Sequence, residues 1–338
     1  MGMTNRQRFH ALMNFEPVDR LPMIEWAMWW GKTIDRWKRE GLPDELTDEG
    51  DIREYFGLDA VRQLWFNPIK ATYPPTEYGR GLVSDRKSYN KIKKHLYPEK
   101  SRDVLASGTF DRKKIEGWAN RQAKGKMIVW ITLEGFFWFP RRLFGIEKHL
   151  YAFYDEPEVM HAINSDLLDY NLQVLEQFCQ ICKPDFMTFA EDMSYNNGPM
   201  ISKSLFDEFM APYYKKIVPE LRRNGIIPFI DSDGDVSKMV PWFDEVDVEG
   251  FLPLEYQSGV NIAELRRKHP KLKMIGGYNK MVMSKGEPEM RAEFERILPV
   301  MKQGGYIPSV DHQTPPEVSL KNYRIYIELL KEYCVKAA

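Results

Sequence analysis

The chain has 338 residues, 43% of them hydrophobic and 13% aromatic, and its formal net charge is -1 at pH 7. Acidic and basic residues are interspersed, so no basic stripe is present to neutralise phosphates, and nucleic acid is excluded as an expected partner. With no apolar run of about eighteen residues, no apolar N-terminal segment and only three cysteines, the composition predicts a cytoplasmic protein without a membrane span, a secretory signal or a disulfide framework.

Eight short apolar runs, separated by amphipathic stretches, follow an N-terminal segment (residues 1–19) in which we expect a helix. The runs cover residues 20–26, 60–66, 127–133, 186–190, 226–230, 250–254, 273–277 and 305–310. Such regular alternation of strand-like and helix-like segments predicts a parallel sheet. Residues 67–98, rich in Pro, Tyr, Gly and Lys, form an expected excursion after the second strand.

Helical spacing of apolar residues is clear over residues 156–182, 202–224 and 288–303. Ser202 and Asp48 stand where N-cap residues are expected. Eight strands with intervening helices predict an α/β protein whose residues 1–338 form one (β/α)8 TIM barrel domain. A doubly wound open sheet is the main alternative, but it usually carries a Gly-rich phosphate turn, which this sequence lacks.

Acidic side chains mark six of the eight runs, mostly at the ends where a barrel places its catalytic groups. They are Glu25, Glu134, Glu191, Asp192, Asp231, Asp233, Asp235, Glu255 and Asp311, the last followed by His312. Carboxylates gathered at one mouth raise one another's pKa or bind a metal, and either outcome suits acid–base chemistry. The expected catalytic residues are Glu191, Asp192, Asp231, Asp233, Asp311 and His312.

Asp231 and Asp233 are alternate residues at a strand end, so both can face the barrel mouth. Their spacing is similar to the start of a calcium loop, but Trp242 stands where that loop needs its last acid, which excludes an EF-hand. His312 is a candidate general base or metal ligand, with a structural histidine as the alternative. The other histidines fall on helical or loop patterns and are expected bystanders: His10, His95, His149, His161 and His269.

Aromatic residues cluster near the same strand ends. They are Trp26, Trp29, Trp30, Trp65, Phe66, Phe136, Phe137 and Trp138. Aromatic runs in loops would be exposed unless they cover something, so a flat aromatic substrate or a docked planar partner is expected to bury them.

Four segments make the chain similar to the uroporphyrinogen decarboxylase superfamily over nearly its whole length. They are residues 6–22 (RQRFHALMNFEPVDRLP), residues 191–214 (EDMSYNNGPMISKSLFDEFMAPYY), the Asp-Ser-Asp-Gly-Asp segment 231–235, and residues 304–316 (GGYIPSVDHQTPP). The resemblance implies a (β/α)8 barrel. It also implies one of two activities, tetrapyrrole decarboxylation or corrinoid-dependent methyl transfer.

The sequence departs from the decarboxylase branch where that branch holds its polycarboxylate substrate. The resemblance implies arginines after the first strand, but residues 24–30 (IEWAMWW) contain none and include the acid Glu25. Electrostatic complementarity to the substrate is therefore missing. The catalytic aspartate expected after the second strand also has no clear counterpart near residues 65–68.

The methyltransferase branch fits better through residues 191–199, with one departure. Members that methylate a thiol bind zinc through His-x-Cys and a further cysteine, whereas Asp231, Asp233 and Asp311 or His312 stand at those positions here. Without thiolates a thiol-activating zinc site is not expected. Whether a divalent metal such as zinc binds to the candidate ligands Asp231, Asp233 and His312 stays open.

The resemblance thus implies a substrate-demethylating component of an O-demethylase system, which moves a methyl group from a small aromatic methyl ether to cobalt. The sequence lacks Asp-x-His-x-x-Gly, so a separate partner would carry the corrinoid (cobalamin). The alternatives are a tetrapyrrole or small-acid decarboxylase and a non-catalytic tetrapyrrole- or corrinoid-binding protein. The oligomeric state, a homodimer included, stays open. The expected substrate-binding residues are Glu25, Trp29, Trp30, Trp65, Phe136, Phe137, Tyr195 and Asn196.

Overall fold

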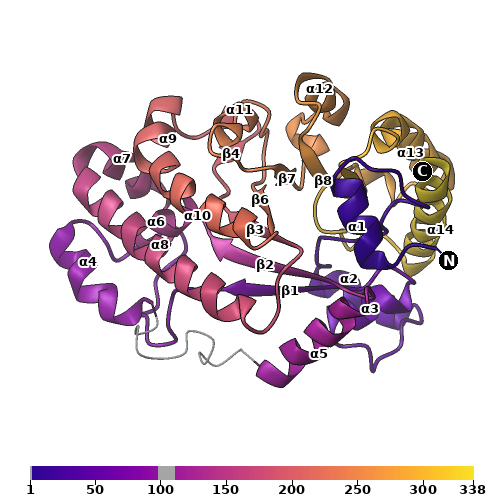
Figure 1. Ribbon diagram of the computed structural model, residues 1–338, viewed down its shortest axis with the longest axis horizontal. Coiled ribbons are helices and arrows are strands. Elements are labelled where there is room, and N and C mark those ends of the chain that lie inside the picture. Colours follow the sequence, from indigo (N-terminus) through magenta and orange to yellow (C-terminus); the bar gives the residue numbers. More distant parts are fainter. Residues whose placement is uncertain (1, 98–110) are drawn as a thin grey trace.

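A curled parallel sheet runs through the centre of the molecule in the computed structural model, which describes residues 2–97 and 111–338 (Figure 1). Its order is β1-β2-β3-β6-β7-β8-β9. Within the described ranges these seven strands are β1 (Val61–Phe66), β2 (Ile128–Glu134), β3 (Phe186–Ala190), β6 (Ile227–Asp231), β7 (Gly250–Leu252), β8 (Lys273–Tyr278) and β9 (Tyr306–Val310). The predicted TIM-barrel-like α/β fold is confirmed, and each of these strands coincides with a predicted apolar run.

Strand register sets where the site can form. Glu134 is aligned with Ala190, Ala190 with Asp231, and Asp231 with Leu252, so the carboxyl ends of four strands lie level. The strands β2 and β3 are buried along their whole length because helices cover the sheet, which is why they read as continuous apolar runs. Residues that follow these strands therefore emerge at one mouth.

The strand predicted over residues 20–26 is wrong. This segment is extended but forms no ladder, and the sheet has seven strands in the described chain instead of eight. Pro22 has no amide hydrogen to give to a ladder. The segment nevertheless lies between the first and last strands, since the Met23 carbonyl accepts from the Asp59 amide (2.9 Å) and the Trp26 indole donates to the Val310 carbonyl (2.6 Å).

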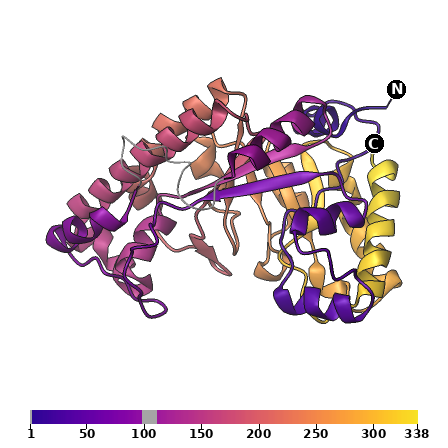
Figure 2. The ribbon, with the colours of Figure 1, turned by 90° about the horizontal axis from the view of Figure 1, so that it is seen from below.

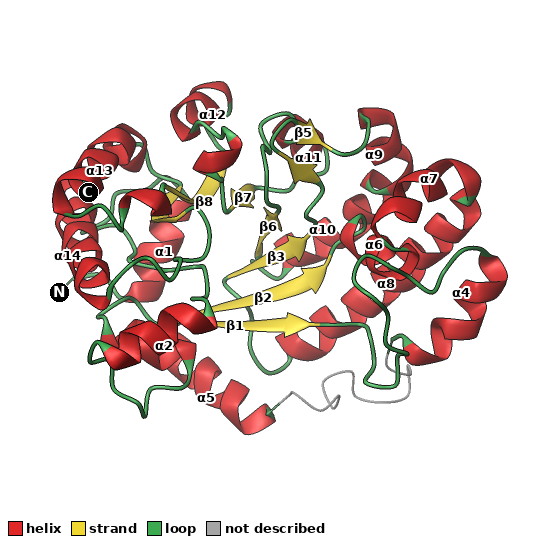
Figure 3. Ribbon diagram, turned by 180° about the vertical axis from the view of Figure 1, so that it is seen from behind, coloured by secondary structure: helices red, strands yellow, loops and turns green. Residues whose placement is uncertain are grey.

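Helices pack around the sheet (Figures 1 and 3). The first seven in the described chain are α1 (Asn5–Met13), α2 (Gly31–Arg39), α3 (Glu49–Tyr55), α4 (Arg86–Ile92), α5 (Arg112–Ala123), α6 (Trp138–Phe144) and α7 (Ile146–Asp155). The others are α8 (Pro157–Cys179), α9 (Lys203–Phe209), α10 (Ala211–Arg223), α11 (Val240–Asp244), α12 (Ile262–Lys268), α13 (Glu287–Met301) and α14 (Leu320–Lys336). No helix in the described part of the chain is both long and apolar enough to cross a membrane.

Several local predictions are confirmed. An N-terminal helix is present as α1, and Asp48 and Ser202 cap α3 and α9 by accepting from the amides of Gly50 and Leu205. The helix predicted over residues 202–224 is interrupted at Met210 and forms α9 and α10.

The excursion after β1 carries α4 and returns to the body of the protein through the bridges Ile69 to Leu96 and Arg80 to Gly145. Residue 98, its predicted end, lies outside the described residues. Figure 2 shows α4 at the far side of the molecule from the C-terminal helix, and both chain ends beside that helix. The N-terminal segment is held there by the Leu21 amide, which donates to the Cys334 carbonyl (3.0 Å).

Candidate active site

A cavity of about 170 Å³ lies at the mouth where the strands end. Its walls combine tryptophans with three aspartates and one histidine. The lining residues are Trp26, Ala27, Met28, Gln63, Trp65, Trp130, Trp138, Ala190, Asp192, Asp231, Asp233, His312 and Gln313. Four of the six residues expected to be catalytic therefore share one cavity, which Glu191 and Asp311 do not line.

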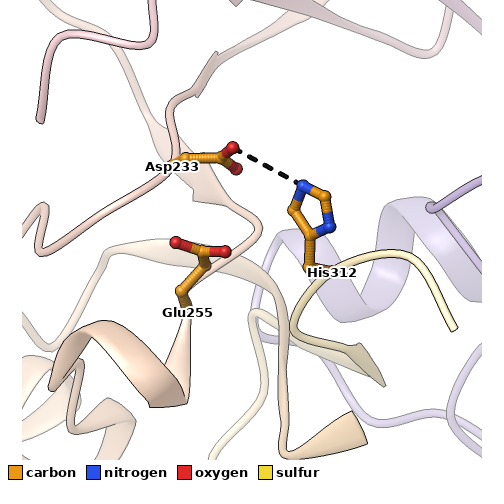
Figure 4. A group of neighbouring side chains, drawn as sticks. All are labelled: Asp233, Glu255 and His312. Atoms are coloured by element: carbon orange, nitrogen blue, oxygen red, sulfur yellow. Dashed lines mark ion pairs between the residues drawn. The ribbon is translucent and has the colours of Figure 1, made fainter. Parts of the chain in front are cut away.

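Three side chains point toward one another at one side of this mouth, namely those of Asp233, Glu255 and His312 (Figure 4). The His312 Nε2 atom lies 3.5 Å from a carboxylate oxygen of Asp233, and one ligand atom from each of the three residues lies within 4.8 Å of the others. The contact with Asp233 raises the pKa of His312, against the opposing effect of burial. This group can hold a proton or a cation.

Glu255 comes from the segment that follows β7 and is fixed by the Gly234 amide and the Ser258 hydroxyl, both of which donate to its Oε2 atom at 2.9 Å. Its other oxygen accepts no hydrogen bond from the described residues. Sequence reasoning noted this acid at a strand end but did not select it as a site residue. The geometric metal group differs from the predicted one, since it contains Glu255 where we expected Asp231.

Asp192 and Asp231 form the acidic side of the cavity. Asp192 has a backbone φ of 37°, which a non-glycine residue rarely adopts, and its carboxylate accepts from the Asp233 amide (3.2 Å). Burial and the neighbouring charge of Asp233 raise the pKa of Asp192 to about 6.

Asp231 has no hydrogen-bond or ion-pair partner for its carboxyl group in the described chain. Burial, with the added repulsion of Asp192 and Asp233, raises its pKa well above the ordinary value. Asp231 is therefore an acid positioned inside the cavity whose ionisation is disfavoured.

Glu191 lies outside the cavity and is fully buried at the N-terminus of α6. Its oxygens accept from the backbone amides of Phe136 (2.8 Å), Phe137 (2.8 Å) and Trp138 (3.1 Å) and from the Tyr214 hydroxyl. Burial raises the pKa of this carboxyl to about 7, and these hydrogen bonds oppose the shift. These hydrogen bonds indicate that Glu191 stabilises the turn before α6.

Asp311 is likewise buried and bonded to backbone. Its two oxygens accept from the amides of Tyr256 and Lys280, both at 3.1 Å, and Lys280 Nζ lies 3.9 Å away. Burial raises its pKa to about 6, with Lys280 opposing the shift. Asp311 thus holds together the segments that follow β7 and β8, and it supports its neighbour His312.

The expected substrate-binding residues separate into three groups. Only Trp65 lines the cavity. Trp30, Tyr195 and Asn196 are exposed. The remaining four are buried away from it, namely Glu25, Trp29, Phe136 and Phe137.

The four buried residues have packing partners elsewhere. Glu25 accepts from the Ser309 hydroxyl. Trp29 packs on Trp37 and Tyr323 with ring centroids 5.7 and 5.8 Å apart. Phe136 packs on Tyr214 and Phe137 on His149, at 5.0 and 4.6 Å.

Sequence reasoning missed Met28, Gln63, Trp130 and Gln313. A signal was present for two of them. Gln63 and Trp65 alternate on β1, as Trp130 and Thr132 do on β2, and residues two apart on a strand share a face. The Gln63 amide in fact donates to Thr132 Oγ1 (2.8 Å).

His149, an expected bystander, makes the stability depend on pH. It is fully buried, neither ring nitrogen has a partner in the described chain, and burial lowers its pKa to about 3. Because the pKa in the unfolded chain is roughly 6.5, this contribution to stability is present above that pH and is lost as the pH falls, by about 1.4 kcal/mol per pH unit.

We therefore expect the free energy of unfolding of His149→Phe to decline less steeply than that of the wild type between pH 6 and pH 4.5. Urea unfolding at several pH values measures both slopes, and His95→Phe, at a half-buried histidine, is the control. Parallel curves for wild type and His149→Phe would contradict the assignment.

Comparisons with known proteins agree with the fold. A family model described as uroporphyrinogen decarboxylase (URO-D) matches residues 134–333, whereas the curated proteins contain no match. Among solved structures, the chain is similar to a methyltransferase from Methanosarcina mazei, with a TM-score of 0.72, 14% identity, and coverage of 98% of this chain and 99% of that one. This likeness supports the fold.

A weaker likeness is to a putative vitamin-B12 independent methionine synthase from Listeria monocytogenes, with a TM-score of 0.44, 11% identity, and coverage of 94% and 98%.

Proposed function

Because the chain belongs to the uroporphyrinogen decarboxylase (URO-D) family, we propose that it is a cytoplasmic methyltransferase that takes a methyl group from a small donor and passes it to the cobalt of a corrinoid carried by a partner protein. The observation that carries the proposal is the cavity, in which the carboxyl group of Asp231, without a hydrogen-bond partner in the described chain, lies among tryptophan side chains. The methyltransferase likeness supports a barrel of the same kind.

The size of the cavity limits what enters it. A volume of about 170 Å³ is close to the roughly 150 Å³ that accommodates benzene in an apolar protein cavity. A small methylated donor fits, but a tetrapyrrole or corrinoid macrocycle does not.

A corrinoid would instead bind at the rim, where large apolar side chains near the strand ends are 42–49% exposed. These are Met28, Trp30, Trp65, Tyr195, Tyr256 and Met281. When bound, a corrinoid supplies the cobalt that accepts the methyl group.

The acids have a physical role if the donor is an ether, the class that the sequence suggested. An aryloxide is a poor leaving group until it is protonated, and a positioned acid typically contributes roughly 10²- to 10⁴-fold in rate. Burial, with the added repulsion of Asp192 and Asp233, disfavours the ionisation of Asp231 and so suits it to supply such a proton.

A metal ion would fit the group of Asp233, Glu255 and His312. Two carboxylate oxygens and one imidazole nitrogen suit a divalent cation of hard or borderline character. Such an ion would polarise a donor oxygen.

An anaerobic assay tests the proposal. Purified protein, cobalt(I) cobalamin and a panel of methoxylated aromatics and methylamines are mixed, and methylcobalamin formation is followed by absorbance. We expect at least one donor to yield methylcobalamin, with none formed when either protein or donor is omitted. Failure of every donor on the panel would count against methyl transfer.

We also expect no decarboxylation of uroporphyrinogen. The residues that line the described cavity include no arginine or lysine to pair with that substrate's carboxylates, and three aspartates would repel them. Anaerobic incubation followed by chromatography should recover the substrate intact. Coproporphyrinogen formed at ordinary enzymatic turnover would show that the decarboxylase alternative is correct.

A further inference from the structure

We propose that the cavity is selective for a methylated ammonium cation, so that the donor is an amine bearing several N-methyl groups and not a neutral ether. This inference rests on the proposed function and names its substrate class. It is carried by the walls of the cavity, by its charge and by its size.

Two of the tryptophans that line the cavity, Trp26 and Trp130, have their N–H groups bonded to the protein. The indole of Trp26 donates to the Val310 carbonyl (2.6 Å), and that of Trp130 donates to Thr188 Oγ1 (3.0 Å). Walls of this kind offer aromatic surface without a hydrogen-bond donor. They suit a methyl-covered ligand that has no acceptor to satisfy, and an aromatic face attracts a cation in particular.

One tryptophan of the cavity lining, Trp138, already has a cation over its ring. The guanidinium carbon of Arg141 lies 5.1 Å from the ring centroid of Trp138. Trp26 packs edge-on against the His312 ring, with ring centroids 6.3 Å apart, whereas Trp65 is 45% exposed and carries no Lys or Arg over its ring in the described chain. The ring of Trp65 is therefore left for a cation that comes from solution.

The charge of the cavity also favours a cation. Three carboxyl groups line it, and the single ionisable base in its lining, His312, is already paired with Asp233. The carboxyl group of Asp231 has no partner in the described chain. A bound ammonium ion would relieve the repulsion among the three acids, whereas a neutral ether would leave it unchanged.

Size and chemistry are consistent with this ligand. A trimethylammonium head has few heavy atoms, which suits a cavity of about 170 Å³. During transfer the carbon–nitrogen bond breaks, its electron pair stays on nitrogen, and a neutral amine leaves without needing a proton. The methyl acceptor, a cobalt(I) corrinoid in the proposed function, supplies the pair for the new bond.

Calorimetric titration of the full-length protein with two probes of matched shape tests the inference. Choline carries a trimethylammonium group, and 3,3-dimethylbutan-1-ol places a neutral carbon where choline has nitrogen. Because cation–π and carboxylate interactions act only on the charged probe, we expect choline to bind at least roughly tenfold more tightly. Equal binding of the two probes, or binding of the neutral one alone, would overturn the inference.

Variants locate the binding. Trp65→Leu and Asp231→Asn should each weaken choline binding several-fold while the variants stay folded, because both side chains are partly exposed. Trp242→Leu, at a tryptophan outside the cavity lining, is the matched control. Choline binding that is unchanged in both cavity variants would place the cation elsewhere and refute the proposal.

The titration needs no corrinoid, so its outcome is independent of methyl transfer. If methoxylated aromatics alone yield methylcobalamin, the proposed function stands and this inference falls. If choline binds selectively but no donor on the panel is demethylated, the selectivity of the cavity for an ammonium cation stands and the proposed methyl transfer falls.

Discussion

Asp231→Asn is expected to lower kcat/KM for methyl transfer per folded molecule, and for an ether donor the loss should be roughly 10²- to 10⁴-fold, which is the usual cost of losing a positioned acid. Asparagine preserves the shape of the side chain but carries no acidic proton. Asp231 contributes little to the core, so the midpoint of thermal unfolding should change little. Steady-state rates, normalised to the folded fraction, measure the effect.

The two donor classes differ in which kinetic constant responds. An ether that needs protonation predicts that Asp231→Asn lowers kcat, whereas a cation held by charge predicts that it mainly raises KM. Asp235→Asn is the matched control, because Asp235 lies in the same segment but does not line the cavity. Rates equal to wild type in Asp231→Asn would exclude both roles.

Asp231, Asp233 and His312 should act as one unit. If so, the double variant Asp233→Ala with His312→Ala loses little more activity than either single variant, because residues of one constellation are strongly non-additive. If a metal is bound, both single variants also lower the metal content. If the three substitutions have independent and near-neutral effects on activity, the three side chains are only solvated surface groups and the site assignment is wrong.

Glu191→Ala is expected to destabilise the fold by roughly 4 kcal/mol or more. The substitution leaves three buried backbone amides and the Tyr214 hydroxyl without their acceptor, and each such loss costs about 1–3 kcal/mol. Urea unfolding measures the change, with Glu176→Ala, at an exposed glutamate, as the control. A Glu191→Ala variant that is as stable as the wild type but inactive would contradict the structural role and indicate that Glu191 is catalytic.

The contrast between Glu191 and Asp192 shows what the sequence could and could not predict. Both follow β3, and both were expected to be catalytic, because an acid at a strand end tends to reach the mouth. Adjacent residues point in different directions, so Asp192 lines the cavity while Glu191 is buried. The amides that hold Glu191 belong to residues 136–138, more than fifty positions earlier, and no local pattern announces such a partner.

The fold was more predictable than the site for a similar reason. Apolar runs identify strands buried on both faces, and seven of the eight predicted runs are strands in the described chain. Residues 20–26 share that composition, but Pro22 interrupts the ladder, and the segment is held by side-chain and single backbone bonds.

The central claim is that this cavity transfers a methyl group, and a single turnover with an isotopically labelled donor tests it most directly. The protein is incubated anaerobically with cobalt(I) cobalamin and a donor whose methyl groups carry deuterium, and the recovered cobalamin is analysed by mass spectrometry. We predict trideuteromethyl cobalamin in wild-type reactions and a strongly reduced yield with Asp231→Asn. Unlabelled or unmodified cobalamin with every donor, or equal labelling by Asp231→Asn, would contradict the account.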